Sequence, residues 1–464
     1  MLRMTLYKVS RSEVAVVWFR RDLRLTDHPA LTAAIATARR VVPLFVLDDR
    51  LLAQAAPARA WFLRGSVAEL DRSLRERQSG LLVRTGDPAT VVPEVARAVG
   101  AETVLASRDV TPYARARDAA VAAALEREGR TLELREGLLL ADPERVRTGA
   151  GRPYTVFTPF WRRLQQEPRR SPLPAPTSVP TPRELLRDPC PSEAGDPPDP
   201  DLPEPGEGAA RERLDRWVGA GLSDYGSGRE LLDGSGSSRL GADLHFGTLS
   251  PLQVETAAVE RGVDAEAFIR QLAWRELYHH HLYHRASDSR SESPLTAAFR
   301  SEADDPAAVA AWRDGRTGIP TVDAAMRQLS TTGWMSNRAR LVVASFLTRH
   351  LLMDWRVGER HFLAHLVDGD VANNRGGWEW SAGVGLDAQP WFRILNPVRQ
   401  GQRFDPEGGW VRRWIPELES VPDRYVHAPW ESPEPVAGYP APIVDLAEGR
   451  ARALAAFRAA TRRD

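Results

Sequence analysis

The hydrophobic periodicity of this chain changes once along its length, and that change limits the folds open to it. Near the N-terminus, short β-rich runs alternate with Ala-, Arg- and Glu-rich stretches that have helical spacing, a pattern typical of a parallel sheet with crossover helices. From about residue 209 onward the spacing is almost wholly helical, most clearly over 321–355. The β-rich runs occupy residues 14–19, 41–47, 81–85, 103–107 and 131–136.

A proline-rich segment at 167–208 separates the two patterns. Because so much proline opposes helix and central strand, we expect a semi-rigid connector that runs over the surface. A chain of 464 residues is also too long for one ordinary core. The sequence therefore predicts an α/β domain over 13–141, a Pro-rich interdomain linker over 142–208 and a helical domain over 209–464.

The composition excludes several classes of function. Lys and Arg number 62, as do Asp and Glu, so a polyanionic partner must be met by a local basic patch. Cys190 is the only cysteine, which excludes disulfide frameworks and multi-thiolate metal sites. Lys8 is the only lysine, which argues against a lysine-built phosphate loop. With neither a long apolar run nor a signal peptide, we expect a soluble, cytoplasmic protein.

One stretch, residues 368–383, combines carboxylates, adjacent asparagines and tryptophans. Such groups are costly to bury without partners, and a large polar heterocycle would supply donors and acceptors to all of them; a solvated loop is the alternative. Two glycines before the tryptophans favour close backbone approach over a helix interior. The residues concerned are Asp368, Asp370, Asn374, Trp378 and Trp380.

Long motifs spread over nearly the whole chain closely resemble the photolyase/cryptochrome family, most of all its class I cyclobutane pyrimidine dimer photolyases. The resemblance implies a Rossmann-like α/β N-terminal antenna domain with a parallel sheet and an all-α C-terminal FAD-binding domain. It also implies repair of UV-damaged DNA by electron transfer from photoexcited reduced FAD. The motifs are at residues 16–31, 271–280, 317–341, 354–362 and 368–405.

The same resemblance implies two sets of residues around the flavin. Asn374 matches the residue that faces the flavin N5, and an amide can both donate and accept a hydrogen bond there. Trp378 and Trp355 match the first two members of an electron-transfer chain, whose third position holds Glu302, so either another aromatic side chain completes the path or photoreduction is slow. The implied cofactor-binding residues are Tyr225, Ser237, Ser238, Arg239, Leu240, Arg340, Asp368, Asp370 and Asn374.

Contacts with the damaged base are implied next. Trp274 and Trp380 match an aromatic pair that cradles the extruded dimer, and Gln271, Asn337 and Asn374 complete the implied catalytic set. Residues 391–415 carry a local excess of three positive charges that suits a DNA backbone. The implied DNA-binding residues are Arg229, Trp274, Arg275, Arg338 and Arg393.

Three positions depart from the family pattern. Gln271 stands where dimer-repairing relatives usually have glutamate, Ser336 where they commonly have histidine, and Leu341 replaces a methionine. Gln271 also occurs in (6-4) photolyases, but that chemistry needs a histidine acid at position 336. Cyclobutane dimer repair is therefore the leading interpretation. A blue-light photoreceptor without repair activity is the main alternative, and a plain flavoprotein oxidoreductase is another.

The sequence also bears on further ligands and partners. His280 and His284 lie one helical turn apart and could begin a metal site. Further ligands for a metal are missing, so we expect no bound metal ion. Residues 106–118 lack the Asn-Glu pair of folate-binding relatives and look more like the deazaflavin-binding ones. We thus expect a deazaflavin antenna rather than a folate, no membrane partner, and a monomer.

Overall fold

The computed structural model describes residues 12–182, 184, 195–285, 293–388, 390 and 392–461. Its N-terminal part is an α/β domain, as the sequence predicted. The described strands form one parallel sheet in the order β3-β2-β1-β4-β5. The strands are β1 (Ser12–Phe19), β2 (Ala38–Leu47), β3 (Leu82–Thr85), β4 (Thr103–Ser107) and β5 (Thr131–Arg135).

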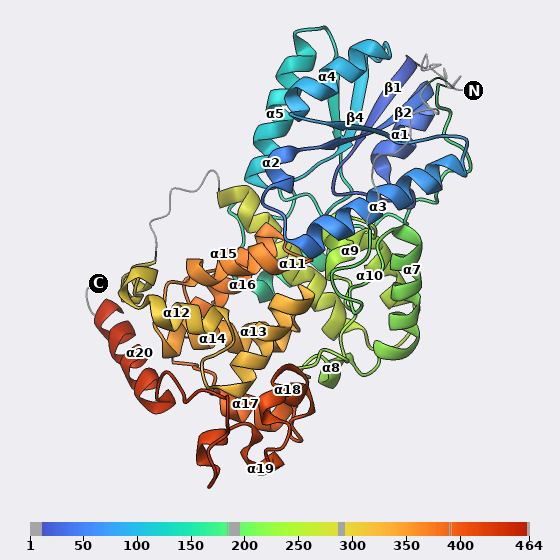
Figure 1. Ribbon diagram of the computed structural model, residues 1–464. Coiled ribbons are helices and arrows are strands. Elements are labelled where there is room, and N and C mark those ends of the chain that lie inside the picture. The colour runs from blue at the N-terminus through green and yellow to red at the C-terminus, as the bar shows by residue number, and fades with distance from the viewer. Residues whose placement is uncertain are drawn as a thin grey trace.

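Crossover helices cover both faces of this sheet. Apolar side chains of α1 and α3 pack on one face, and those of α4 and α5 pack on the other (Figure 1). Proline recurs at the first turn of these helices, where its missing N–H costs no hydrogen bond. The helices of this domain are α1 (Pro29–Thr37), α2 (Asp49–Leu52), α3 (Pro57–Arg75), α4 (Pro88–Ala98) and α5 (Pro112–Glu126).

The rest of the described chain is helical, which also confirms the sequence-based expectation. Its main core gathers α12 to α16 with α18 around buried tryptophans. The helices are α6 (Phe157–Gln165), α7 (Glu207–Arg216), α8 (Tyr225–Gly228), α9 (Gly241–Phe246), α10 (Pro251–Glu260), α11 (Glu266–Arg285), α12 (Pro306–Arg313), α13 (Pro320–Thr332), α14 (Asn337–Ser345), α15 (Trp355–His365), α16 (Val371–Ala382), α17 (Pro397–Phe404), α18 (Gly409–Trp414), α19 (Asp423–Val426) and α20 (Leu446–Thr461).

The predicted linker 142–208 is wrong in its first part, because helix α6 forms there and buries Phe157 and Phe160 against α11. Later in the range, Val179 and Leu202 pack into the core of the α/β domain. The proline-rich part has no regular strand where it is described, as expected, but it is anchored by these apolar side chains. Cys190 lies outside the described residues.

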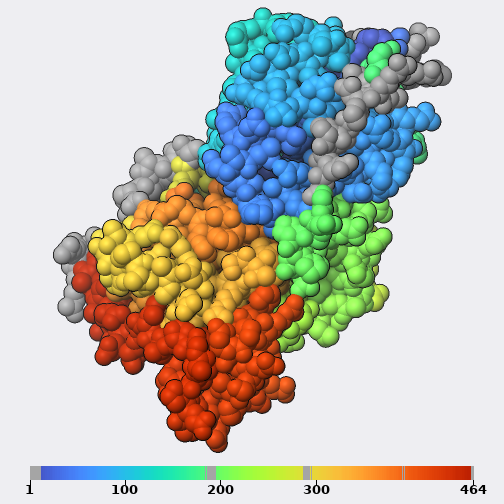
Figure 2. Space-filling model, in the orientation of Figure 1, coloured from blue at the N-terminus to red at the C-terminus, as the bar shows by residue number. Residues whose placement is uncertain are grey.

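The two domains are joined by the loop that follows β1. Leu23 N–H donates to the Phe246 carbonyl of α9 at 3.2 Å, and the buried Arg24 guanidinium donates to the Gly247 carbonyl at 2.9 Å. A Cβ at Gly247 would lie 2.0 Å from the Arg21 carbonyl oxygen, so only glycine permits this approach. The α/β domain therefore rests directly on the helical domain (Figure 2). In the part of the chain that is described, no helix is long and apolar enough to cross a membrane.

Candidate functional site

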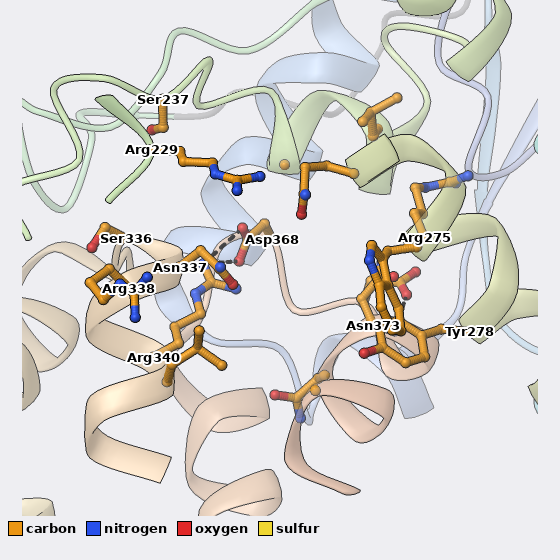
Figure 3. Close-up of a pocket in the computed structure, with 18 of the residues that line it drawn as sticks. Arg229, Ser237, Arg275, Tyr278, Ser336, Asn337, Arg338, Arg340, Asp368 and Asn373 are labelled. Carbon is orange, nitrogen blue, oxygen red and sulfur yellow. Dashed lines mark hydrogen bonds and ion pairs between the residues drawn. The ribbon is translucent and has the colours of Figure 1, made fainter. Parts of the chain in front are cut away.

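A cavity of about 710 Å³ opens in the helical domain, within the size range of cofactor sites. It lies among α11, α14, α16 and the segment 225–241. Figure 3 shows Asp368 and Arg340 on one side of this open space and Arg275 and Tyr278 on the other. Five arginines but only three carboxylates line the cavity, which suits an anionic ligand.

Asp368 and Arg340, both predicted to bind the cofactor, form an ion pair. Both carboxylate oxygens of Asp368 accept from Arg340 Nη2, at 2.9 and 3.0 Å, and Arg340 Nε donates to the Met335 carbonyl. A Cβ at Gly241 would lie 2.4 Å from Asp368 Oδ2. The absence of a side chain there lets the segment 236–241 approach this pair closely.

Hydroxyl groups of the same segment border the cavity. Ser237 and Ser238 both line it, as does the ring of Tyr225, and burial raises the pKa of Tyr225 to about 12. Arg229 lines the cavity too, with its Nε 3.4 Å from a Glu230 carboxylate oxygen. The Ser237 hydroxyl donates to the Gly234 carbonyl at 2.9 Å, which leaves the Ser238 hydroxyl as a donor that suits a diphosphate.

Arg239 was predicted with this group, and the structure places its side chain elsewhere. The Arg239 guanidinium lies over the Trp334 ring, 4.4 Å from its centroid, and donates to the Asp201 carbonyl at 2.9 Å. Its backbone has a φ of 53°, which turns the chain at this point. The Arg239 side chain therefore points away from the cavity, and a cofactor contact at this residue would have to use its backbone.

Asp370 borders the cavity but is occupied by protein partners. Its Oδ1 accepts from Asn373 N–H and caps α16, and its Oδ2 lies 2.5 Å from Arg21 Nη2 and 3.3 Å from His279 Nε2. Next to these cations the pKa of Asp370 is held well below its ordinary value despite burial. The predicted direct cofactor contact through Asp370 is not supported by these bonds.

Helix α16 brings Asn374, Trp378 and Trp380 to the cavity. The expectation that the two glycines before Trp378 avoid a helix interior was wrong, since α16 runs through them. The expected close approach is real: a Cβ at Gly376 would lie 2.2 Å from the Tyr278 ring.

Asn374 is oriented by its own amide. Its Nδ2 donates to the Glu359 carbonyl at 3.0 Å, which leaves Oδ1 as a hydrogen-bond acceptor at the cavity.

The predicted electron-transfer residues Trp378 and Trp355 belong to one hydrophobic core cluster. Trp378 lines the cavity, and Trp355 is buried in the same core cluster without lining it. A Cβ at Gly358 would lie 2.1 Å from the Trp378 ring, so this glycine lets α15 pack on it. Trp378 also meets the Trp312 ring edge to face, with centroids 6.1 Å apart. Glu302, at the predicted third position, pairs with Arg313 at 2.7 Å and with Arg360 at 3.5 Å.

One face of helix α11 forms the wall of the cavity opposite Asp368 and Arg340. Gln271, Trp274 and Tyr278 follow each other at helical spacing, and all three line the cavity. The Trp274 ring stacks on the Phe157 ring of α6, with centroids 4.2 Å and planes 5° apart. Trp274 and Trp380 thus share one cavity, as predicted.

Helix α14 and its N-cap residue, Ser336, contribute another part of the wall. Asn337 and Leu341 line the cavity. The Ser336 hydroxyl donates to the Leu232 carbonyl at 2.8 Å and accepts from Ala339 N–H as the N-cap of the helix. Because both roles of this hydroxyl are taken up by the backbone, Ser336 is built to hold the helix rather than to transfer protons.

Among the predicted DNA contacts, only some are placed to reach a substrate. Arg229 and Arg338 line the cavity, and Arg338 pairs with Glu230. Arg275 is buried and donates to the Leu138 carbonyl at 3.2 Å, with Glu276 as its ion-pair partner at 3.1 Å. Arg275 also lines the cavity, but its guanidinium is bound to protein partners at the domain junction, so a contact between Arg275 and DNA stays a prediction.

The predicted basic patch at 391–415 is also smaller than its sequence suggests. Arg412 pairs with Asp423 at 2.6 Å and Arg413 with Asp201 at 2.5 Å, so partners distant in sequence offset these two charges. Arg393 is exposed and lies outside the cavity.

The sequence interpretation missed several residues that line the cavity. Helical spacing on α11 could have identified Arg270 and Tyr278, which lie on the face that carries Trp274. No local signal points to the others, because they come from separate elements. The missed residues are Glu230, Gly241, Leu244, His245, Phe268, Arg270, Leu272, Tyr278, Ala344, Phe362, Leu366, Asn373, Gly377 and Ser381.

The histidines of α11 bind separate carbonyls. His280 Nε2 meets the Ala141 oxygen and His284 Nε2 the Pro143 oxygen, both at 3.1 Å. Over the described ranges, no cluster of three His, Cys, Asp or Glu side chains could hold a metal ion.

The fold and the site define a two-domain protein in which an α/β domain sits on a helical domain with a large, cationic cofactor cavity. Family models match both domains: "DNA photolyase" over 15–180 and "FAD binding domain of DNA photolyase" over 268–459. The chain belongs to the photolyase/cryptochrome family, and its cofactor is FAD. The hydroxyl of Ser238 and the acceptor Oδ1 of Asn374, which both border the cavity, fit that ligand.

Full-length relatives and solved structures agree with this assignment. The chain is 44% identical to a deoxyribodipyrimidine photo-lyase from Streptomyces griseus, over 95% of this chain and 98% of the relative. It superposes on a bacterial class III photolyase from Agrobacterium tumefaciens with a TM-score of 0.88 and 36% identity, covering 99% and 100% of the two chains. An archaeal photolyase from Sulfolobus tokodaii with two FAD molecules gives a TM-score of 0.81 and 28% identity, covering 96% and 100%.

Proposed function

We propose that this protein repairs cyclobutane pyrimidine dimers in UV-damaged DNA by a light-driven reaction. One observation carries the proposal: Trp274 and Trp380 line the same cavity as the cofactor-binding residues Asp368 and Asn374. A flipped base stacked on these tryptophans would share one cavity with the cofactor. The relatives named deoxyribodipyrimidine photo-lyase, at up to 44% identity among those compared, support the same activity.

Bound FAD would supply the photoexcited electron that splits the dimer. The chain's own residues bind and orient the two partners. Arg340 and Asp368 would hold the cofactor on one wall, and Asn374 offers its Oδ1 to a donor on the flavin ring. On the facing wall, Trp274 offers an aromatic surface, and stacking of this kind is worth about 1–3 kcal/mol per base.

The contacts of Ser336 favour cyclobutane dimers over (6-4) lesions. A (6-4) reaction needs an acid near the lesion, and Ser336 is 2% exposed with its hydroxyl engaged as a helix cap. Gln271 would offer a neutral amide to the pyrimidine where a glutamate would offer a charge.

The test uses purified holoenzyme with chemically reduced flavin and an oligonucleotide that carries one thymine dimer. Blue light should restore the intact thymines, and darkness should not. Recovery of flavin without any repair under light would overturn the proposal and favour the photoreceptor alternative. A parallel oligonucleotide with a (6-4) lesion should stay unrepaired.

We further propose that the α/β domain holds an antenna chromophore and that the protein acts as a monomer. The segment 106–118, which resembles deazaflavin-binding relatives, favours a deazaflavin over a folate. It follows β4 at the carboxyl edge of the sheet, where β1 and β4 adjoin and the strand order reverses. Mass spectrometry of the released chromophores identifies the antenna, and light scattering gives the oligomeric state.

A further inference from the structure

The ring of Phe157 supports the ring of Trp274. Phe157 is 2% exposed and stacks on Trp274 with their planes 5° apart, so it covers one face of that ring. Trp274 itself is half-buried and lines the cavity. A stacked base can therefore use only the face of Trp274 that Phe157 leaves open.

A second side chain of α11 also lies against Phe157. The Arg270 guanidinium is 5.1 Å from the centroid of the Phe157 ring, and Arg270 stands one helical turn before Trp274. Phe157 is thus in contact with two residues of the wall that faces the cavity. Neither contact is local in sequence, since Phe157 belongs to α6.

The chain just before α6 is tied to the opposite wall as well. Asp387, in the turn after α16, accepts from the Phe157 N–H at 3.2 Å, and its own N–H donates to the Thr155 carbonyl at 3.0 Å. Helix α16 carries Trp380. The segment 155–157 therefore contacts Trp274 itself and also the turn that follows the helix of Trp380.

We infer that Phe157 is a positioning residue that holds Trp274 in the orientation needed to stack on an extruded base. This inference rests on the proposed function. A ring already fixed loses less conformational freedom when a base stacks on it, so the support should strengthen lesion binding in particular. Phe157 does not line the cavity and acts only through Trp274.

The test compares Phe157→Leu with Phe160→Leu. Phe160 belongs to the same helix and core and is 1% exposed, but its ring packs on Tyr154 and His280 rather than on Trp274. Both variants remove one buried ring. We expect Phe157→Leu to raise the Kd for dimer-containing DNA about tenfold. The Kd for intact DNA, the flavin content and the repair yield at saturating DNA should stay near the wild-type values.

Phe160→Leu should lower thermal stability to a similar degree and leave the Kd for lesion DNA within about twofold. Equal losses of lesion affinity in the two variants, or none in Phe157→Leu, would overturn the inference. If Phe157→Leu does not fold, Phe157→Tyr tests the inference instead. This variant keeps the aromatic ring and should retain the affinity for lesion DNA. A folded Phe157→Tyr protein that binds lesion DNA about tenfold more weakly would refute the stacking role. A wild-type protein that repairs no dimers would instead refute the proposed function.

Discussion

The Arg340 side chain neutralises a carboxylate that is otherwise nearly buried, since the Asp368 side chain is only 12% exposed. Arg340→Ala should weaken FAD binding about tenfold or more, because it leaves that charge unpaired beside the cofactor. Arg340→Lys keeps the charge but loses the planar fork, so an intermediate loss is expected. Fluorimetric titration of the apoprotein with FAD measures the effect. FAD affinity unchanged in Arg340→Ala would remove this pair from the cofactor site.

Buried histidines should make the fold sensitive to acid. Burial lowers the pKa of His245 to about 4 and that of His280 to about 3, from 6.5. Since the folded pKa lies below the unfolded one, the neutral imidazole contributes stability that is complete above about pH 6.5. That contribution is lost as the pH falls toward the folded pKa. Each group adds a slope of about 1.4 kcal/mol per pH unit in this window.

Urea unfolding at about pH 7 and about pH 5 measures this slope, with His280→Gln as the comparison. The variant should lose less unfolding free energy than the wild type between the two pH values. An identical pH dependence in both proteins would mean that His280 contributes nothing to acid sensitivity.

At the scale of elements, two adjacent glycines of α16 should respond to substitution in opposite ways. A Cβ at Gly376 would strike the Tyr278 ring of α11, whereas a Cβ at Gly377 meets no atom within 4 Å and borders the cavity. Gly377→Ala should stabilise the cofactor-free protein by about 0.5–1 kcal/mol through helix propensity yet weaken FAD binding. Gly376→Ala should destabilise both forms. Thermal melts with and without FAD check this, and equal behaviour of the two variants would contradict it.

The packing of α15 against α16 bears on the electron relay. Arg356 and Arg375 lie over the Trp355 ring, at 5.0 and 5.6 Å, and would disfavour positive charge on it. With Glu302 at the third position, blue light and a mild reductant should photoreduce the oxidised enzyme slowly. Glu302→Trp should speed photoreduction and leave repair by prereduced enzyme nearly unchanged.

Transient absorption follows this reaction, with Trp378→Phe as the control that should abolish it. Fast photoreduction in the native protein, with no gain from Glu302→Trp, would show that another aromatic side chain completes the path. Trp312 contacts Trp378, so Trp312→Phe would be the first variant used to identify that side chain.

Across the whole molecule, an ion pair between a partly buried arginine and a buried carboxylate connects the two domains. Arg21 follows β1, Asp370 caps α16, and their side chains meet at 2.5 Å. Arg21→Ala should destabilise the protein by about 3 kcal/mol, because the buried Asp370 carboxylate would keep only two histidines and the Asn373 N–H as partners. Arg39 is the matched control: it is 70% exposed, and Arg39→Ala should change little. A melting temperature equally unaffected in both variants would show that the pair does not hold the domains together.

The sequence by itself determined the two-domain architecture and much of the cavity. Short β-rich runs placed the strands, and helical spacing after about residue 209 placed the helical domain, because these signals act within a few residues. The segment 368–380 carried the cofactor side of the site for the same reason, since one helix and its cap bring Asn374, Trp378 and Trp380 to one cavity.

Only the tertiary structure decided which partner each charged or aromatic side chain takes. Arg21 and Asp370 are 349 positions apart, and no local pattern predicts their contact. Arg275 and Arg239 resemble ligand-binding arginines in sequence, yet one is bound to the Leu138 carbonyl and the other to the Trp334 ring. Phe157 falls in the segment predicted to be a linker, yet it belongs to α6 and stacks on Trp274. The physical reason is common to all of these: a buried charge or ring is satisfied by whatever neighbour the packed chain supplies, and that neighbour is fixed by long-range packing.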